Sequence, residues 1–183
     1  MTVGLVERAR DGDHAAFTEL IAVDGDRCYA IAYRILRDTE RAQDAVQVAY
    51  LQAWRGLRNL RDAERFGVWL YRLLVNACYE ESRRHRRWNV HVRALPVDGP
   101  SVADPTIAVD DRDALDRAFE RLTPEHRVVV VLHHYVGLPL TTIADVIGVP
   151  VGTVKSRLHY APRILRAALT AADEPERREV RPA

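Results

Sequence analysis

Apolar residues recur along this chain with the period of an α-helix. Between Arg41 and Arg58 they fall at the i, i+3, i+4, i+7 positions of one helix face. The same stripe appears between Cys28 and Leu36 and again between Phe66 and Cys78. No segment alternates with the period of two that a β-strand requires. The sequence therefore predicts an all-α fold, with three or four helices in its first half and four in its second.

Glycines suggest where the first helices end. Gly12 and Gly25 interrupt the N-terminal stretch, which predicts a short helix around His14 to Ala22. The tail from 173 to 183 contains Pro175, Pro182 and mixed charges, and it is expected to be disordered.

A helix-turn-helix pattern lies in the second half of the chain. Thr123-Pro124-Glu125 has the residues of a helix start, and Gly137 can end that helix. A short helix is expected from about Leu140 to Ile147, followed by a Gly148-Val149-Pro150 turn. A second helix should begin near Val151.

This second helix has an apolar and a polar face. Val154, Leu158 and Ala161 should point inward, whereas Pro162 should kink or stop the helix near Ala161. At 100° per residue the outward face and its cationic flanks comprise Gly152, Thr153, Lys155, Ser156, Arg157, His159, Tyr160 and Arg163. Such a surface suits the major groove of DNA, with base edges read at the centre and phosphates at the flanks. An ordinary helix pair on a bundle surface has a similar pattern, so this pattern alone leaves both interpretations open.

The charge balance hides local segregation. The 183 residues include 27 basic and 26 acidic side chains, and 48% of the chain is apolar, which excludes a disordered protein. The segment 83–93 is basic and the segment 98–116 is acidic, with prolines and glycines between them, which predicts a linker over 94–109. The basic run is either a solvated helix end or a polyanion contact.

Several features fit a cytoplasmic protein. The chain has no run of about 20 apolar residues, and its N-terminus does not resemble a secretory signal. Its two cysteines, Cys28 and Cys78, are far apart in sequence and should behave as small buried hydrophobes.

Three segments together resemble the bacterial RNA polymerase sigma factors of the extracytoplasmic-function (ECF) class. The run from Ile143 to His159 is similar to their promoter −35-binding segment, especially over 151–158. Asp44 to Tyr50, followed by Ala53-Trp54, resembles the helix that docks on core polymerase. Phe66 to Arg72 with Asn76 resembles the segment that opens and reads the −10 element.

The resemblance implies a transcription initiation factor and not an enzyme, with no metal or cofactor. It implies a region 2-like domain over 1–93, which binds polymerase and the −10 element, and a region 4-like domain over 110–172, which binds the −35 element. The implied polymerase contacts, on the clamp coiled coil of the largest subunit, are Asp44, Gln47 and Leu51. The implied −35 contacts are Thr153, Lys155, Ser156, Arg157, His159, Tyr160 and Arg163. The implied −10 contacts are Asn59, Arg61, Asp62, Glu64, Arg65, Tyr71, Arg72, Asn76, Arg83, Arg84, Arg86 and Arg87.

The same resemblance gives expectations for two tryptophans and for one further partner, and the sequence departs from the family pattern at three places. Trp69 should be in the core and Trp88 exposed. An anti-sigma factor is an expected partner. Val48 replaces a usual acidic residue, Pro139-Leu140 a usual Ser-aromatic pair, and Pro162 a usual basic residue.

Two alternatives come from other classes of protein. A stand-alone helix-turn-helix regulator would bind DNA without polymerase. A metal-dependent hydrolase would use His126, His133 and His134, but adjacent histidines on a helix point about 100° apart and no hydrolase motif is present.

Overall fold

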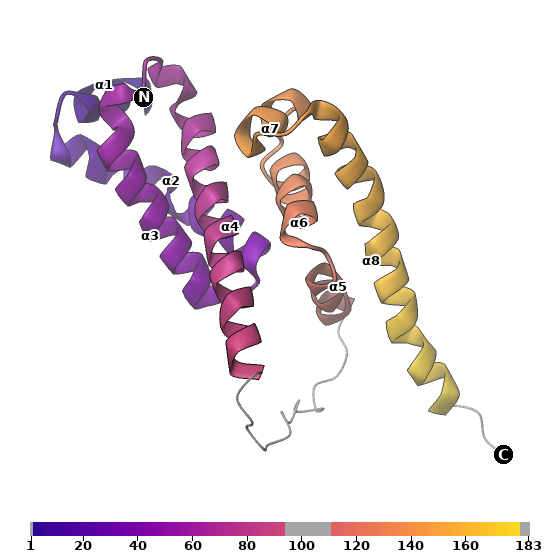
Figure 1. The fold of residues 1–183 in the computed structure, drawn as a ribbon. Helices are drawn as coiled ribbons and strands as arrows, with labels where there is room; N and C mark the ends of the chain where they lie inside the picture. Colours follow the sequence, from indigo (N-terminus) through magenta and orange to yellow (C-terminus); the bar gives the residue numbers. More distant parts are fainter. Residues whose placement is uncertain (1, 94–110, 180–183) are drawn as a thin grey trace.

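Both domains of the protein are built from helices (Figure 1). In each domain, two short loops join the first three α-helices. The computed structural model describes the backbone of residues 2–93 and 111–179 and the side chains of 3–88 and 116–170. Within these ranges the chain forms eight α-helices and no strand, so the predicted all-α fold with two helical domains is confirmed. The expected linker, 94–109, lies outside the described residues.

The N-terminal domain packs its helices side by side around one apolar core. Its elements are α1 (Thr2–Arg10), α2 (His14–Leu36), α3 (Thr39–Gly56), two 3-10 turns (Leu57–Asn59 and Ala63–Arg65) and α4 (Phe66–Arg93). Leu20, Ile31, Leu70 and Leu74 are almost fully buried in this core. The stripes predicted from the sequence are therefore the buried faces of α2, α3 and α4.

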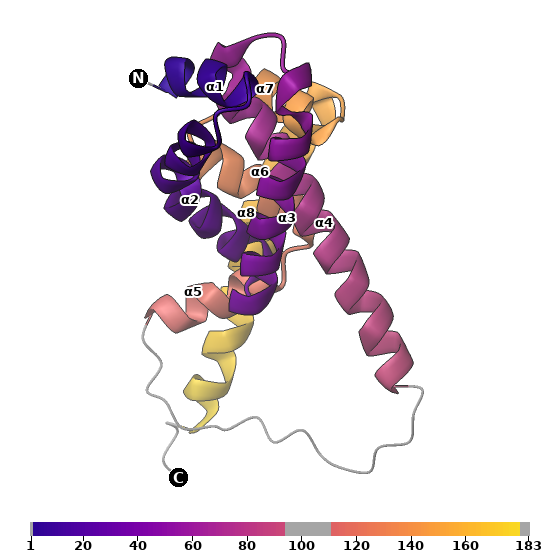
Figure 2. The ribbon, with the colours of Figure 1, turned by 90° about the vertical axis from the view of Figure 1, so that its left-hand side faces the viewer.

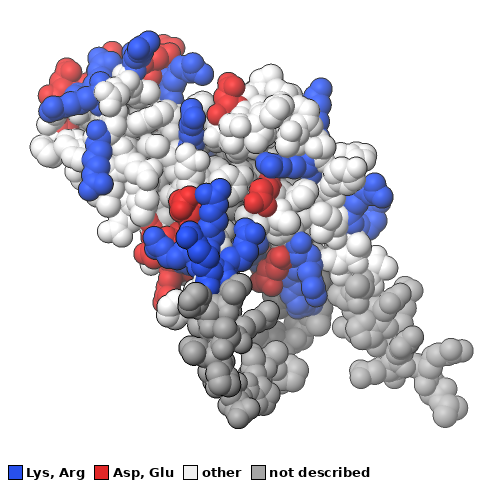
Figure 3. Space-filling model, viewed as in Figure 1, with Lys and Arg blue, Asp and Glu red and all other residues white. Residues whose placement is uncertain are grey.

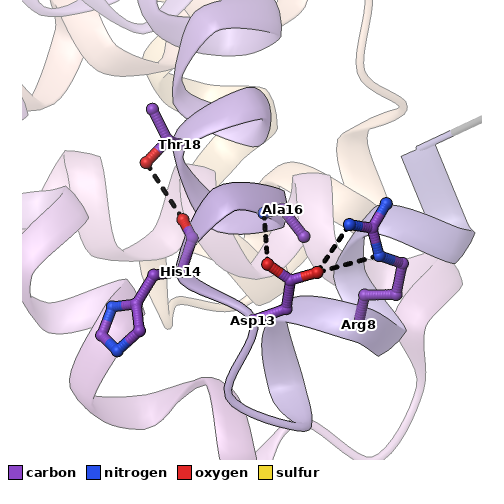
Figure 4. Close-up of polar contacts among 5 residues, drawn as sticks. All are labelled: Arg8, Asp13, His14, Ala16 and Thr18. Atoms are coloured by element: carbon purple, nitrogen blue, oxygen red, sulfur yellow. Dashed lines mark hydrogen bonds and ion pairs between the residues drawn. The ribbon is translucent and has the colours of Figure 1, made fainter.

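Aspartates begin two of these helices. Asp13 accepts a hydrogen bond from the Ala16 amide at 3.0 Å and forms an ion pair with Arg8 (Figure 4). Both interactions lower the pKa of Asp13. Asp38 caps α3 in the same way through the Arg41 amide, which lowers its pKa as well. Gly12, with φ of 102°, makes the turn before Asp13, as its position in the sequence predicts.

The predicted break at Gly25 is wrong. Helix α2 runs unbroken for 23 residues from His14 to Leu36. Leu20 and Cys28, on either side of Gly25, are buried in the same core. Because this packing exceeds the roughly 1 kcal/mol that a glycine costs within a helix, the helix continues.

The C-terminal domain contains the expected helix-turn-helix. Its elements are α5 (Asp111–Glu120), α6 (Pro124–Val130), a π-helical turn (Val131–Tyr135), α7 (Leu140–Ile147) and α8 (Val151–Glu179). Thr123 caps α6, and Gly137 and Gly148 adopt positive φ of 83° and 68° at the two turns. Val154 and Ala161 are fully buried and Leu158 is half-buried, so the inward face of α8 is confirmed.

Of the two outcomes expected at Pro162, a kink or a stop, the stop is wrong. The helix continues to Glu179, so the tail expected to be disordered from 173 is helical as far as 179. Pro162 is exposed, so water can solvate the carbonyl that loses its partner, and Ala161 remains buried beside it. Helix α8 also packs against α5, and extending an existing helix carries no nucleation cost.

Replacing Pro162 with Ala should stabilise the protein. A proline within a helix costs about 3 kcal/mol relative to alanine, and the more flexible unfolded chain of the variant offsets part of that gain. We expect the free energy of unfolding to rise by about 2 kcal/mol, measured by urea denaturation followed by circular dichroism. Pro124→Ala is the matched control, because Pro124 lies at the first turn of α6, where proline is favourable, and should bring no gain. An unchanged stability in Pro162→Ala would contradict this account.

The two domains pack against each other along α4 and α2. Helix α7 lies against α4, and α6 and the π-helical turn lie against α2 (Figure 2). Buried residues from both domains, among them Leu74, Val128 and Ile143, belong to one continuous apolar cluster. Polar contacts cross the same junction: Arg27 donates to the Val136 carbonyl at 3.3 Å, and the Arg34 guanidinium lies 3.9 Å from the Tyr135 ring centre.

Candidate nucleic-acid and polymerase interface

The outward face of α8 is free in this arrangement. Gly152, Lys155, Ser156, His159 and Tyr160 are all exposed. This face also carries Arg163, whose guanidinium lies 5.8 Å from the Tyr160 ring centre, and half-buried Thr153. Packing of the two domains therefore leaves the predicted −35 contact surface accessible, apart from one residue.

That residue is Arg157, which is half-buried and turned toward α4. It lines a cavity of about 130 Å³ with Tyr79, Arg86 and Glu125. Burial raises the pKa of Tyr79 to about 12, and the charge of Arg157 opposes this rise. The structure thus separates Arg157 from the exposed reading face and places it at the junction of the two domains.

The loop between α3 and α4 forms one wall of a second cavity. Arg61, Asp62, Arg65 and Arg72 line this cavity of about 290 Å³, so four of the twelve predicted −10 contacts come together. Asp62 also accepts a hydrogen bond from the Glu64 amide at 2.9 Å, which fixes the 3-10 turn of the loop. Of the remaining predicted contacts on this loop and α4, Asn59, Glu64 and Asn76 are exposed and lie outside the cavity lining.

Five residues of this cavity were not among the predicted site residues: Leu60, Val68, Trp69, Asp145 and Val146. Trp69 was expected in the core, but it is only half-buried: its ring lies against Gly56 and Phe66 and it also lines the cavity. Its spacing one turn after Arg65 could have indicated this position. Asp145 of α7 lines the cavity from the other domain, which no sequence pattern indicated.

Tyr71 lies in a different environment from the other predicted −10 contacts on α4. It is half-buried beside Arg27, whose guanidinium lies 5.8 Å from the ring centre, and burial raises its pKa. Tyr71 thus lies at the junction between the domains and not on the open flank of α4.

The C-terminal part of α4 is a strongly basic surface. Arg83, Arg84, Arg86 and Arg87 are exposed there, and Figure 3 shows basic side chains gathered in this region with acidic ones beside them. Arg83 pairs with Glu80 at 2.9 Å and Arg84 pairs with the buried Glu81 at 3.0 Å. Trp88, as expected, is exposed, to 69%.

The outer face of α3 carries the predicted polymerase contacts. Asp44, Gln47 and Leu51 are exposed at i, i+3 and i+7 spacing, and Leu51 and Val48 expose 47% and 36% of their surface. The predicted contact residues therefore all lie on one accessible face of α3.

The chain is similar to known proteins over both of its domains. The Sigma-70 region 2 model matches residues 20–88 and the Sigma-70 region 4 model matches residues 112–161. The ECF RNA polymerase sigma factor SigM of Mycobacterium tuberculosis is 38% identical over 146 residues, which are 80% of this chain and 73% of SigM. The chain belongs to the ECF sigma factors. The ECF sigma factor SigW of Bacillus subtilis is 25% identical over 177 residues, or 90% of this chain and 94% of SigW.

Solved structures are similar to this sigma factor in fold. CnrH, solved in complex with the cytosolic domain of CnrY, matches with a TM-score of 0.65 and 26% identity, over 93% of this chain and 97% of CnrH. The sigma factor RpoE of Bartonella quintana, solved with the anti-sigma factor NepR, matches with a TM-score of 0.67 and 21% identity, over 84% of this chain and 96% of RpoE.

Family membership decides between the functions that the sequence left open. Sigma factors are DNA-binding transcription initiation factors that recognise promoters, and the stand-alone regulator is not favoured because the match includes the first domain. The histidines of the hydrolase alternative have structural contacts: His126 Nδ1 lies 2.9 Å from the Thr123 hydroxyl and His133 Nδ1 lies 3.2 Å from the Leu138 carbonyl. No helix among the described residues is long and apolar enough to cross a membrane.

Proposed function

We propose that this sigma factor binds core RNA polymerase through the outer face of α3 and reads promoter DNA with two separate surfaces. Asp44, Gln47 and Leu51 make the polymerase contact, on the clamp coiled coil of the largest subunit. The α3–α4 loop with α4 reads the −10 element, and the outward face of α8 reads the −35 element. The first functional domain spans residues 1–93 and the second spans residues 110–172. The protein acts in the cytoplasm and performs no catalysis of its own.

The exposed polar face of α8 is the observation that carries this proposal. Its centre, Ser156 and His159, presents hydrogen-bonding groups, and Lys155 adds a flanking positive charge. This is the distribution that a helix in the major groove needs, because base contacts specify and phosphate contacts position.

The −10 surface combines hydrogen-bonding groups with positive charge. Asn59, Glu64 and Asn76 are exposed around the cavity formed by Arg61, Asp62, Arg65 and Arg72. A flipped base requires such groups for its edge, and the separated strand requires cations for its phosphates. Arg83, Arg84, Arg86 and Arg87 extend the positive surface along α4, and Tyr71 joins it when the domains separate.

Separation of the two domains is part of this proposal. Asp145 and Val146 of α7 line the same cavity as Arg61 and Arg72, so α7 stands where a DNA strand would follow α4. Arg157 is likewise turned toward α4 and becomes available for phosphate only after separation. Polymerase binding on α3 would hold the domains apart, and joining two weak readers on one complex makes the second contact effectively intramolecular.

An anti-sigma factor is the regulatory partner that we propose. The structure of Bartonella quintana RpoE, similar to this chain in fold, is a complex with an anti-sigma factor. An inhibitor that keeps the two domains in the arrangement seen here would keep α7 over the −10 surface.

Run-off transcription with purified core polymerase on a genomic promoter library tests the proposed function. We expect start sites preceded by two DNA elements at a constant spacing, and no transcripts without the sigma factor. Electrophoretic mobility shifts with and without core polymerase form the control. Tight and specific promoter binding by the free protein, unchanged by polymerase, would contradict the proposal and indicate the stand-alone regulator.

A further inference from the structure

Four arginines from four segments meet in a hollow between the two domains. Arg37 directly follows α2, Arg41 lies on α3, Arg86 on α4 and Arg127 on α6. They line a cavity of about 310 Å³, and Glu120 is the carboxylate in its lining. Guanidinium groups keep their charge at any physiological pH, so gathering four of them is unfavourable unless negative charge compensates them.

Arg37 is held in an unusual conformation with an unused donor. It is the only residue other than glycine in the described chain with positive φ, at 58°. Its side chain is 14% exposed, and its Nη2 pairs with Asp116 Oδ1 at 2.8 Å. Its Nε is buried and has no hydrogen-bond partner. A buried donor without an acceptor is costly, which indicates room for an acceptor that the protein itself does not supply.

Arg41 and Arg127 differ in how far their charge is compensated. The Arg41 Nε is buried and forms an ion pair with Asp38 Oδ2 at 3.0 Å. Arg127 donates hydrogen bonds only to neutral acceptors, the carbonyls of Leu122 and Ile35 at 3.1 and 2.8 Å, while the charges of Glu120 and Glu125 act on it without a hydrogen bond. Burial, together with the charges of Arg37 and Arg41, lowers the pKa of Arg127.

We propose that this hollow binds a small phosphate-class oxyanion, such as inorganic phosphate or pyrophosphate. Asp38, Asp116 and Glu120 compensate part of the positive charge, but none of them accepts a hydrogen bond from the Arg37 Nε. Donors from several elements suit a tetrahedral anion with oxygens in all directions better than a planar carboxylate. Bound phosphate connects the α2–α3 corner of the first domain with α6 of the second, and it therefore stabilises the arrangement in which they are packed together.

The same oxyanion exists free in solution and on a DNA strand. The hollow lies between two packed domains and its lining comes from five helices or their ends, α2 to α6, which favours the small free anion. This site is separate from the exposed face of α8, so its test is independent of the proposed −35 contact.

Calorimetric titration of the full chain with inorganic phosphate and with pyrophosphate, at constant ionic strength, tests the site. We expect saturable binding and a raised Tm in the unmodified protein. Arg37→Gln and Arg41→Gln should each weaken binding about tenfold, because each removes charge-assisted hydrogen bonds. Arg55→Gln, which removes the same charge from an exposed position of α3 outside the hollow, should bind like the unmodified protein.

Two further arms make the outcome decisive. Arg37→Lys retains the charge but loses the forked donor, so it keeps the fold if Arg37→Gln does not, and it should still bind more weakly. A short single-stranded oligonucleotide replaces phosphate in a parallel titration. No binding of either phosphate, or equal binding in all variants, would overturn the proposal. Binding of the oligonucleotide alone, lost in the same variants, would overturn the free anion and assign the hollow to a DNA phosphate.

Discussion

Changing Leu51 to Asp should abolish the activity of this sigma factor with core polymerase. Leu51 exposes 47% of its surface on the outer face of α3, beside Asp44 and Gln47. If polymerase covers this face, the variant buries an unpaired carboxylate, which costs several kcal/mol. We expect a decrease of about 100-fold in run-off transcripts and in affinity for core polymerase, measured by fluorescence anisotropy.

The matched control uses another exposed apolar residue. Val23 of α2 is 54% exposed and lies outside every surface assigned above, so Val23→Asp should retain full transcription. Both variants should unfold at the same urea concentration as the unmodified protein, because neither side chain is in the core. If Leu51→Asp transcribes normally, the outer face of α3 is not the polymerase contact.

Substitutions on α8 should separate base reading from phosphate binding. Ser156 already donates its hydroxyl hydrogen to the Thr153 carbonyl at 2.9 Å, so its oxygen is available as an acceptor, and the His159 ring is exposed beside Tyr160. Ser156→Ala and His159→Ala should each change the preferred −35 sequence, with about tenfold lower discrimination at one base position. Lys155→Ala should instead weaken binding evenly across sequences and reduce its dependence on salt.

Binding by polymerase holoenzyme to a randomised −35 library, at several salt concentrations, distinguishes these effects. Arg121→Ala, which removes an exposed charge from outside α8, is the control for a general loss of charge. An unchanged −35 preference in both Ser156→Ala and His159→Ala would refute the assignment of the reading face.

Local patterns in the sequence were sufficient for the helices and their ends. The apolar stripes around Ala45 and Leu70 became buried faces, and Gly12, Gly137 and Gly148 became turns with positive φ. The predictions of a break at Gly25 and a stop at Pro162 were wrong because they weighed one residue's helix propensity without the packing on either side of it.

The candidate site was predictable to different degrees. The outward face of α8 follows from helical periodicity, because an amphipathic helix that buries Val154 and Ala161 must turn its opposite face outward. The half-buried states of Tyr71 and Arg157 were not predictable, since each depends on a helix that is distant in sequence.

The sequence by itself determined the helical class, the helix-turn-helix and the family, because periodicity, caps and motifs are encoded within short stretches of chain. Only the tertiary structure decided that α7 packs against α4, that Asp145 joins the cavity of the α3–α4 loop, and that Arg37, Arg41, Arg86 and Arg127 share one hollow. These contacts join residues up to 90 positions apart, from Arg37 to Arg127, and they depend on how whole helices fit together. No local pattern of apolar and charged residues encodes such a fit.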